Sequence, residues 1–153
     1  MSTHNTINVG TFNMQGGANR KKTCLADDMQ RFKMAALCTS ETKISGNRVD
    51  TLKTTDGKQR YFHYTSGLSK NTKAGVGIII NANYKEDFTS VDDRICKITF
   101  KINNNQNITL ISAYAPTLDV SKKKPHIREH CMMILRQQSN LFSNTICSSS
   151  VAT

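Results

Sequence analysis

The stretch LCTSETK, residues 37–43, begins as an apolar run and ends on a lone carboxylate. Leu37 and Cys38 are typical of a buried strand, whereas a glutamate is almost never buried without a partner. Glu41 therefore marks either a strand end that turns into solvent or a side chain that holds a ligand. The segments around it help to decide between these interpretations.

The segments before and within this stretch predict a strand–helix–strand unit. Apolar and polar residues alternate over residues 6–13, which indicates a strand. Three apolar residues at i, i+4 and i+7 indicate one face of a helix over about 20–34. The quoted stretch then supplies a short strand over about 35–40. A connection of this kind usually makes its two strands parallel.

The rest of the chain predicts further strands and one more helix. The strands are expected over 60–65, 74–81, 94–102 and 107–114, the last two as a hairpin, with residues 44–59 irregular and a helix over 125–143. The fold class is therefore α/β (α+β), with a mixed sheet flanked by helices. One domain is expected over residues 1–140, followed by a frayed, Ser/Thr-rich tail over 141–153.

The composition narrows the class of partner and the cellular setting. The 153 residues include 21 Lys and Arg against 11 Asp and Glu, a net charge of +10. This excess favours an anionic partner, most simply nucleic acid, although it is also compatible with plain solubility. The five cysteines have no CxxC spacing, so neither a zinc site nor a disulfide framework is indicated. With no signal peptide or membrane-spanning stretch, we expect a soluble intracellular protein, nuclear or cytoplasmic.

Polar residues stand at the ends of three predicted strands. They are Asn13, Glu41 and Tyr114. If the first two strands are parallel, Asn13 and Glu41 lie at the same edge of the sheet. One carboxylate beside an amide suits Mg²⁺, which proteins hold with one or two carboxylates, several waters and a substrate phosphate. The alternative is that these are ordinary polar strand ends.

Five short motifs occur along the chain in a fixed order. They are TFNMQG (11–16), SETK (40–43), AGVGIII (74–80), DRICKITF (93–100) and LISAYAPT (110–117). Together they resemble the endonuclease/exonuclease/phosphatase family. Over about residues 6–130 the chain looks most like the apurinic-type endonuclease domain of non-LTR retrotransposons and the related craniofacial development protein 2-like sequences. The resemblance implies a four-layer sandwich of two sheets with helices outside.

The resemblance also implies roles for individual residues. Asn13 matches the family's active-site Asn, a catalytic and metal-site residue, and Glu41 matches the Glu that binds Mg²⁺ or Mn²⁺. Tyr114 matches the catalytic Tyr that contacts the scissile phosphate, and Arg94 a basic residue near the phosphate backbone. Thr39-Ser40 departs from the Leu/Ile-Gln that commonly precedes the Glu, which removes an amide from the surroundings of the metal.

The family's later motifs do not occur in this sequence. These are a Gly-Asp-x-Asn turn, a further Asp and a final Asp-His pair. The sequence therefore leads us to expect the N-terminal half of the sandwich, truncated and inactive alone, which leaves the assignment as an enzyme open. A single sheet would also expose an apolar face, so a partner or self-association over that face is expected.

Two other functions remain open from the sequence. The first is a non-enzymatic basic module that binds nucleic acid, DNA rather than RNA, through phosphate contacts. The candidate nucleic-acid-binding residues are Arg94, Lys43, Lys122, Lys123 and Lys124. The second is a non-functional remnant of a mobile element.

Overall fold

The structure is a computed structural model that describes residues 7–16, 18–67, 75–84, 86–92, 94–103, 106–115 and 145–151. Side chains are not described for residues 18–20, 103, 115 and 145–151. The expected helix over 125–143 and the three lysines of 122–124 lie outside the described residues.

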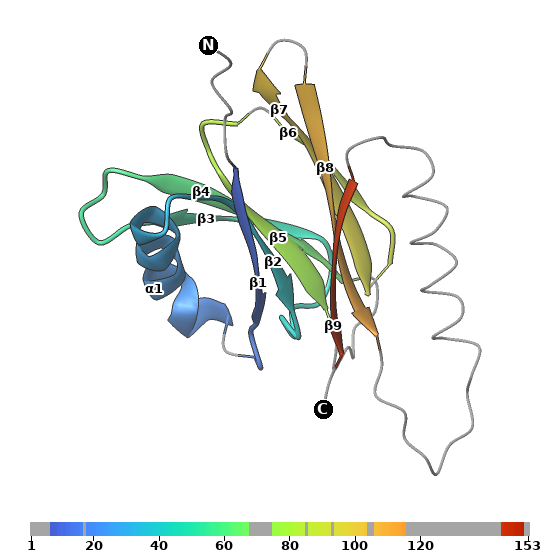
Figure 1. Cartoon of the computed structure of the whole chain (residues 1–153). Helices are drawn as coiled ribbons and strands as arrows, with labels where there is room; N and C mark the ends of the chain where they lie inside the picture. Colours follow the sequence, from blue (N-terminus) through green and yellow to red (C-terminus); the bar gives the residue numbers. More distant parts are fainter. Residues whose placement is uncertain are drawn as a thin grey trace, which may run out of the picture.

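The first half of the chain forms a five-stranded mixed sheet (Figure 1). Its strand order is β1-β2-β5-β4-β3, and β1 and β2 are parallel while the other pairs are antiparallel. The predicted strand–helix–strand unit is thus confirmed. Its elements are β1 (Asn8–Asn13), α1 (Ala18–Arg31), β2 (Met34–Ser40), β3 (Arg48–Lys53), β4 (Arg60–Ser66) and β5 (Val76–Asn81).

The second half adds a four-stranded sheet, ordered β6-β7-β8-β9. Its strands are β6 (Glu86–Ser90), β7 (Ile95–Asn103), β8 (Gln106–Ala115) and β9 (Thr145–Val151). The predicted hairpin is confirmed, because β7 and β8 pair antiparallel. The expectation of a frayed tail is wrong for Thr145–Val151, which pairs in parallel with β8.

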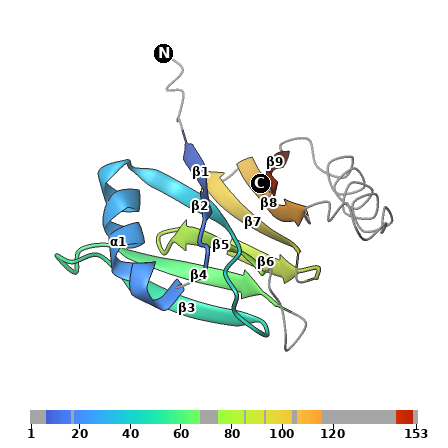
Figure 2. The same ribbon diagram turned by 90° about the horizontal axis from the view of Figure 1, so that it is seen from below.

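Successive side chains of a strand point to opposite faces of its sheet, so the first sheet packs against an apolar layer on each face. On one face of the first sheet, Leu37 and Tyr61 pack against Leu25 and Met29 of α1. On the other face, a larger core fills the space between the two sheets. Its buried members are Ala36, Cys38, Val76, Ile78, Ile80, Cys96, Ile98, Phe100, Leu110 and Tyr114. Figure 2 shows the resulting order of layers: helix, first sheet, second sheet.

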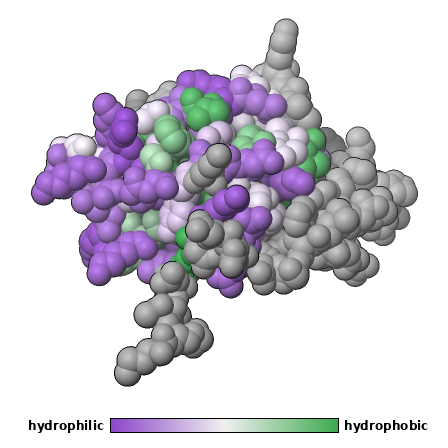
Figure 3. All heavy atoms as spheres, turned by 90° about the horizontal axis from the view of Figure 1, so that it is seen from above, coloured by the Kyte–Doolittle hydropathy of each residue, from purple (hydrophilic) through white to green (hydrophobic). Residues whose placement is uncertain are grey.

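The expectation of an uncovered apolar sheet face is wrong for the described strands. Ile78 of β5 and Leu110 of β8 are fully buried in the core between the two sheets, because the sheets cover each other there. Among the described residues on the face drawn in Figure 3, hydrophilic side chains predominate, with small separate hydrophobic patches.

Two edge strands were not expected from the sequence. β3 lies within residues 44–59, which were expected to be irregular, and β6 forms just after β5. Each has a single neighbour in its sheet. Among the described residues α1 is the one α-helix, and its 14 residues fall short of the roughly 20 apolar residues that a membrane span needs.

A candidate metal and phosphate site

Parallel pairing brings Asn13 and Glu41 to one edge of the first sheet. Asn13, the last residue of β1, pairs with Ser40, the last residue of β2, and Glu41 follows directly. The Asn13 Nδ2 group donates a hydrogen bond of 3.1 Å to Glu41 Oε1. The amide is fixed from its other side as well, since Asn13 Oδ1 accepts from the Gln15 backbone N–H at 3.0 Å. The proximity expected from the sequence is confirmed.

The second sheet contributes Tyr114 to the same carboxylate. The Tyr114 hydroxyl donates to Glu41 Oε1 at 3.1 Å, although the two residues are 73 positions apart. Burial raises the pKa of Tyr114, the bond to Glu41 raises it further, and the charge of Arg94 acts in the opposite direction. The phenol therefore stays protonated as a donor. Glu41 is held from both sheets at once.

The backbone at Glu41 adopts an uncommon conformation that the surrounding loops fix. Its φ is +50°, in the left-handed region that is unfavourable for residues other than glycine. The Glu41 carbonyl accepts from the Gly16 N–H at 3.0 Å, and the next N–H, of Thr42, donates to the Gly75 carbonyl at 3.1 Å. Strain of this kind persists where the surroundings impose it, and it is often found at ligand sites.

The unused polar atoms around Glu41 fit a hard cation with its water shell. Both donors bind Oε1, and no described residue bonds Oε2. The hydroxyls of Ser40 and Thr42 are buried without a hydrogen-bond partner on either side of Glu41. In the part of the chain that the structure describes, no three His, Cys, Asp or Glu side chains gather into a larger metal cluster. A single carboxylate with one free oxygen matches the way proteins hold Mg²⁺, with one or two carboxylates and several waters.

Arg94 supplies a positive charge next to Tyr114. Its guanidinium carbon lies 5.8 Å from the centre of the Tyr114 ring, and the Tyr114 N–H donates to the Arg94 carbonyl at 2.9 Å. The Arg94 Nη1 atom is buried and has no hydrogen-bond partner. A buried, unpaired guanidinium nitrogen is costly, and an anionic oxygen would satisfy it.

Lys43 lies in the loop beyond Glu41, and the stem of its side chain runs beside Gly16. It is exposed, as a residue that contacts a phosphate backbone must be. The structure thus brings together Asn13, Glu41, Tyr114 and Arg94, with Lys43 on the same rim. The three lysines of 122–124 lie outside the described residues.

A buried polar chain below the site was not foreseen from the sequence. His63 Nε2 lies 3.2 Å from the Thr39 hydroxyl, and the Thr39 carbonyl accepts from the Ser112 hydroxyl at 3.2 Å. Thr39 and Ser112 each stand two residues before a site residue, Glu41 and Tyr114. The chain therefore ties together the two strand ends that carry the site. The sequence shows only a histidine within the predicted strand over residues 60–65, His63, and nothing that pairs it with Thr39.

Comparisons with solved structures show which known proteins have a similar fold. The structure is similar to the catalytic domain of APE2 from Xenopus laevis, with a TM-score of 0.64 and 14% sequence identity over 95% of this chain and 58% of that chain. It also matches the AP endonuclease LMAP from Leishmania major, with a TM-score of 0.45 and 13% identity over 68% of this chain and 38% of that chain. This chain thus spans less than two thirds of either structure.

Comparisons of the sequence itself give no relative. No protein-family model matches it, and no curated protein does. The conclusion about fold therefore rests on the arrangement of the two sheets and the helix, shared with the APE2 domain at low identity. The chain shares the fold of the APE2 catalytic domain over most of its length.

Proposed function

We propose that the site around Glu41 is the metal- and phosphate-binding part of a Mg²⁺-dependent phosphodiester hydrolase of the endonuclease type. One observation carries this proposal: an amide from the first sheet and a phenol from the second converge on one oxygen of Glu41 and leave the other open. Such convergence fixes a carboxylate for a ligand. An ordinary polar strand end would need neither donor.

Each residue has a definite task in this proposal. Glu41 ligates the cation through Oε2, while Asn13 and Tyr114 orient the carboxylate through Oε1. Asn13 presents its NH₂ group to this side, so it orients rather than ligates. Arg94 binds a non-bridging phosphate oxygen through its unpaired Nη1. Lys43 contacts a neighbouring phosphate of the nucleic-acid backbone. A bound Mg²⁺ would supply Lewis-acid stabilisation of the charge on the phosphoryl group.

The substrate class follows from the charges and the fold. A chain with a net charge of +10, and with an unpaired Arg94 Nη1 atom beside Tyr114, suits a nucleic-acid phosphodiester better than a small neutral substrate. The solved AP endonuclease catalytic domains with a similar fold support DNA as the proposed partner. The retrotransposon subtype stays a finer proposal based on the five sequence motifs. Sequence flanking the gene, with or without the Asp-x-Asn and Asp-His motifs, tests it.

We propose further that these residues bind but do not hydrolyse a phosphodiester by themselves. Hydrolysis needs a general base for the attacking water. Among the described residues, the one histidine is His63, which is fully buried below the site. Asp92 Oδ1 accepts from the Arg94 backbone N–H at 2.7 Å, but no second carboxylate of the described residues bonds Asn13 or Tyr114. Metal binding without turnover is therefore expected for the chain alone.

The test compares two chemically matched carboxylates. Glu86 accepts from the Tyr64 hydroxyl at 2.7 Å, much as Glu41 accepts from Tyr114, but it lies away from the site. Titration with Mn²⁺, followed by paramagnetic broadening of backbone NMR signals, should broaden residues near Glu41. Glu41→Gln should abolish this broadening and Glu86→Gln should leave it intact. Equal behaviour of the two variants would refute the metal site.

Nicking of supercoiled plasmid with and without Mg²⁺ tests the proposal that the chain alone does not hydrolyse a phosphodiester. We expect no Mg²⁺-dependent nicking above that of Glu41→Gln. Nicking that needs Glu41 would show that the chain is itself an active nuclease. DNA binding that falls with salt yet is unchanged in Glu41→Gln would point instead to the basic binding module.

A further inference from the structure

Two hydrogen bonds join the stacked sheets at consecutive steps of the same two strands. The Tyr114 hydroxyl of β8 donates to Glu41, directly after β2. The Ser112 hydroxyl of β8 donates to the Thr39 carbonyl of β2 at 3.2 Å. Each bond joins residues 73 positions apart in the chain. β8 therefore lies over β2 in step, and the two bonds are about 7 Å apart along the strands, two residues at about 3.3 Å each.

The Ser112 side chain lies on the inner face of the second sheet. Leu110 and Tyr114, two residues to either side on β8, belong to the core between the sheets, and Ser112 is 2% exposed. A buried hydroxyl needs a partner, and Ser112 finds it in a backbone carbonyl of the other sheet. Thr39 is paired with β1 on one side and β5 on the other. Its carbonyl is therefore a fixed point to which β8 is tied.

The side chain of Thr39 is held as well. Its hydroxyl lies 3.2 Å from His63 Nε2, and both residues are fully buried. Gly77 of β5, the strand between them, leaves room for this contact, because a Cβ at Gly77 would lie only 2.8 Å from each of these two atoms. The acceptor of the Ser112 bond is thus fixed through its backbone and its side chain.

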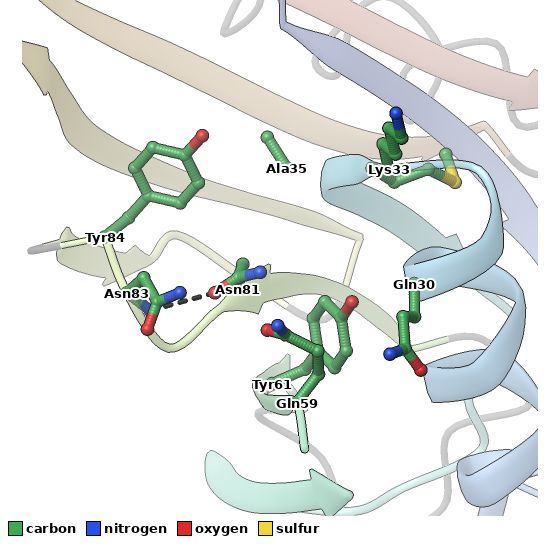
Figure 4. Close-up of a pocket in the computed structure, with 9 residues that line it drawn as sticks. Gln30, Lys33, Ala35, Gln59, Tyr61, Asn81, Asn83 and Tyr84 are labelled. Carbon is green, nitrogen blue, oxygen red and sulfur yellow. Dashed lines mark hydrogen bonds between the residues drawn. The ribbon is translucent and has the colours of Figure 1, made fainter. Parts of the chain in front are cut away.

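The opposite end of β2 offers a less directional contact between the sheets. Ala35 and Tyr84 lie there, in the lining of a cavity of about 250 Å³ (Figure 4). Tyr84 contacts the second sheet through its ring, whose centre is 5.1 Å from that of Phe100. Apolar packing is not directional, whereas a hydrogen bond weakens steeply when it is misaligned. The Ser112 bond is therefore suited to set the position of β8 next to the site.

We propose that Ser112 is a positioning residue of the candidate site, because its bond across the sheets sets where the Tyr114 hydroxyl meets Glu41. Without the Ser112 hydroxyl, β8 shifts over β2 and the phenol leaves Glu41 Oε1. The carboxylate then keeps the Asn13 bond, turns more freely, and binds a cation more weakly. The statement about the cation rests on the proposed function, and the statement about Tyr114 does not.

The test compares three variants of β8 by NMR of the whole chain at pH 7 in EDTA. Ser112→Ala removes the hydroxyl and little volume. Ser112→Thr keeps the hydroxyl, and its extra methyl group has room because a cavity of about 100 Å³ adjoins Ser112. Thr109→Val is the matched control: Thr109 is 3% exposed on the same strand, but its hydroxyl lies 2.9 Å from that of Thr99, within its own sheet.

The Cζ carbon of Tyr114 reports on the bond, because its chemical shift changes when the phenol stops donating to Glu41. Glu41→Ala gives the position of this signal without the bond. We expect Ser112→Ala to move the signal toward that position, and the other two variants to leave it at the wild-type position. When Mn²⁺ replaces EDTA, Ser112→Ala should raise the midpoint of paramagnetic broadening about fivefold, less than the roughly tenfold or more expected for loss of a direct partner of the ligand.

An unmoved Tyr114 signal in Ser112→Ala overturns the proposal. Equal changes in Ser112→Ala and Thr109→Val also overturn it, as does a Ser112→Thr variant that behaves like Ser112→Ala. A moved signal with an unchanged Mn²⁺ midpoint overturns the effect on the cation site. Failure of the proposed function looks different, because the wild type then shows no Mn²⁺ broadening near Glu41. The Tyr114 signal, measured without metal, still decides the role of Ser112.

Discussion

Lowering the pH from 7 to 4 is expected to destabilise the fold through protonation of His63. The side chain is fully buried, with Nε2 against the Thr39 hydroxyl and Nδ1 without a partner. Burial lowers the pKa of His63 from 6.5 to about 4, while Asp50 works against that change and Lys22 with it. The folded state therefore holds the ring neutral in a range where the unfolded chain protonates it.

The magnitude follows from the difference between the two pKa values. The pKa of His63 is about 6.5 when unfolded and about 4 when folded. A gap of about 2.5 pH units, at about 1.4 kcal/mol each, amounts to about 3.5 kcal/mol, of which about 3 kcal/mol is lost by pH 4. Because the folded pKa is the lower one, this contribution is fully present above pH 6.5 and is lost as the pH falls toward 4. It is a large part of the roughly 5–15 kcal/mol stability of an ordinary domain.

Urea denaturation at pH 7 and at pH 4 measures the effect, with His63→Gln as the variant that cannot titrate. Other carboxylates titrate in both proteins, so the difference between their pH dependences isolates His63. We expect the wild type to lose about 3 kcal/mol more than the variant. Equal losses would refute the reasoning. So would an NMR titration of the wild type in which the His63 ring protonates near its ordinary pKa of 6.5.

Three further outcomes follow from the site and the core. Glu41→Gln should lower the pKa of Tyr114, because it removes the carboxylate that helps to raise it; carbon-13 NMR of the tyrosine ring measures this. Phe100→Ala, between the sheets, should cost about 3–5 kcal/mol of unfolding free energy in urea, whereas the 55%-exposed Phe32→Ala should cost almost none. Gly75→Ala, at a φ of +93° and with its new Cβ pressed against the Thr42 hydroxyl, should cost more than about 1 kcal/mol and shift the NMR signals around Glu41.

The parts of the fold that the sequence could predict are those with strong apolar patterning. β2 and β5 carry buried runs, and α1 has its apolar residues at helical spacing. β3 and β6 are edge strands that bury little, so their patterns resemble those of loops. β9 is rich in serine, and its pairing with β8 depends on a partner more than thirty residues away in the chain. Nothing local in Thr145–Val151 signals that partner.

In the candidate site, too, some contacts could be predicted from the sequence and others could not. The contact between Asn13 and Glu41 follows from parallel pairing of consecutive strands and could be predicted. Tyr114 could be placed there only by resemblance, because its strand belongs to the other sheet. The pair of Thr39 and His63 joins strands that are not neighbours, across Gly77 of the strand between them. Such a contact has no periodic signature in the sequence.

The division of the site between two sheets has a consequence for when the proposed cation site forms during folding. Glu41 reaches Tyr114 only once the sheets have docked, so neither sheet could assemble the cation site before the last long-range contacts form. Cation affinity would then appear late during refolding, after most secondary structure, and a Mn²⁺ signal could time that final event. A partly folded species could have native secondary structure by circular dichroism and still not bind the ion.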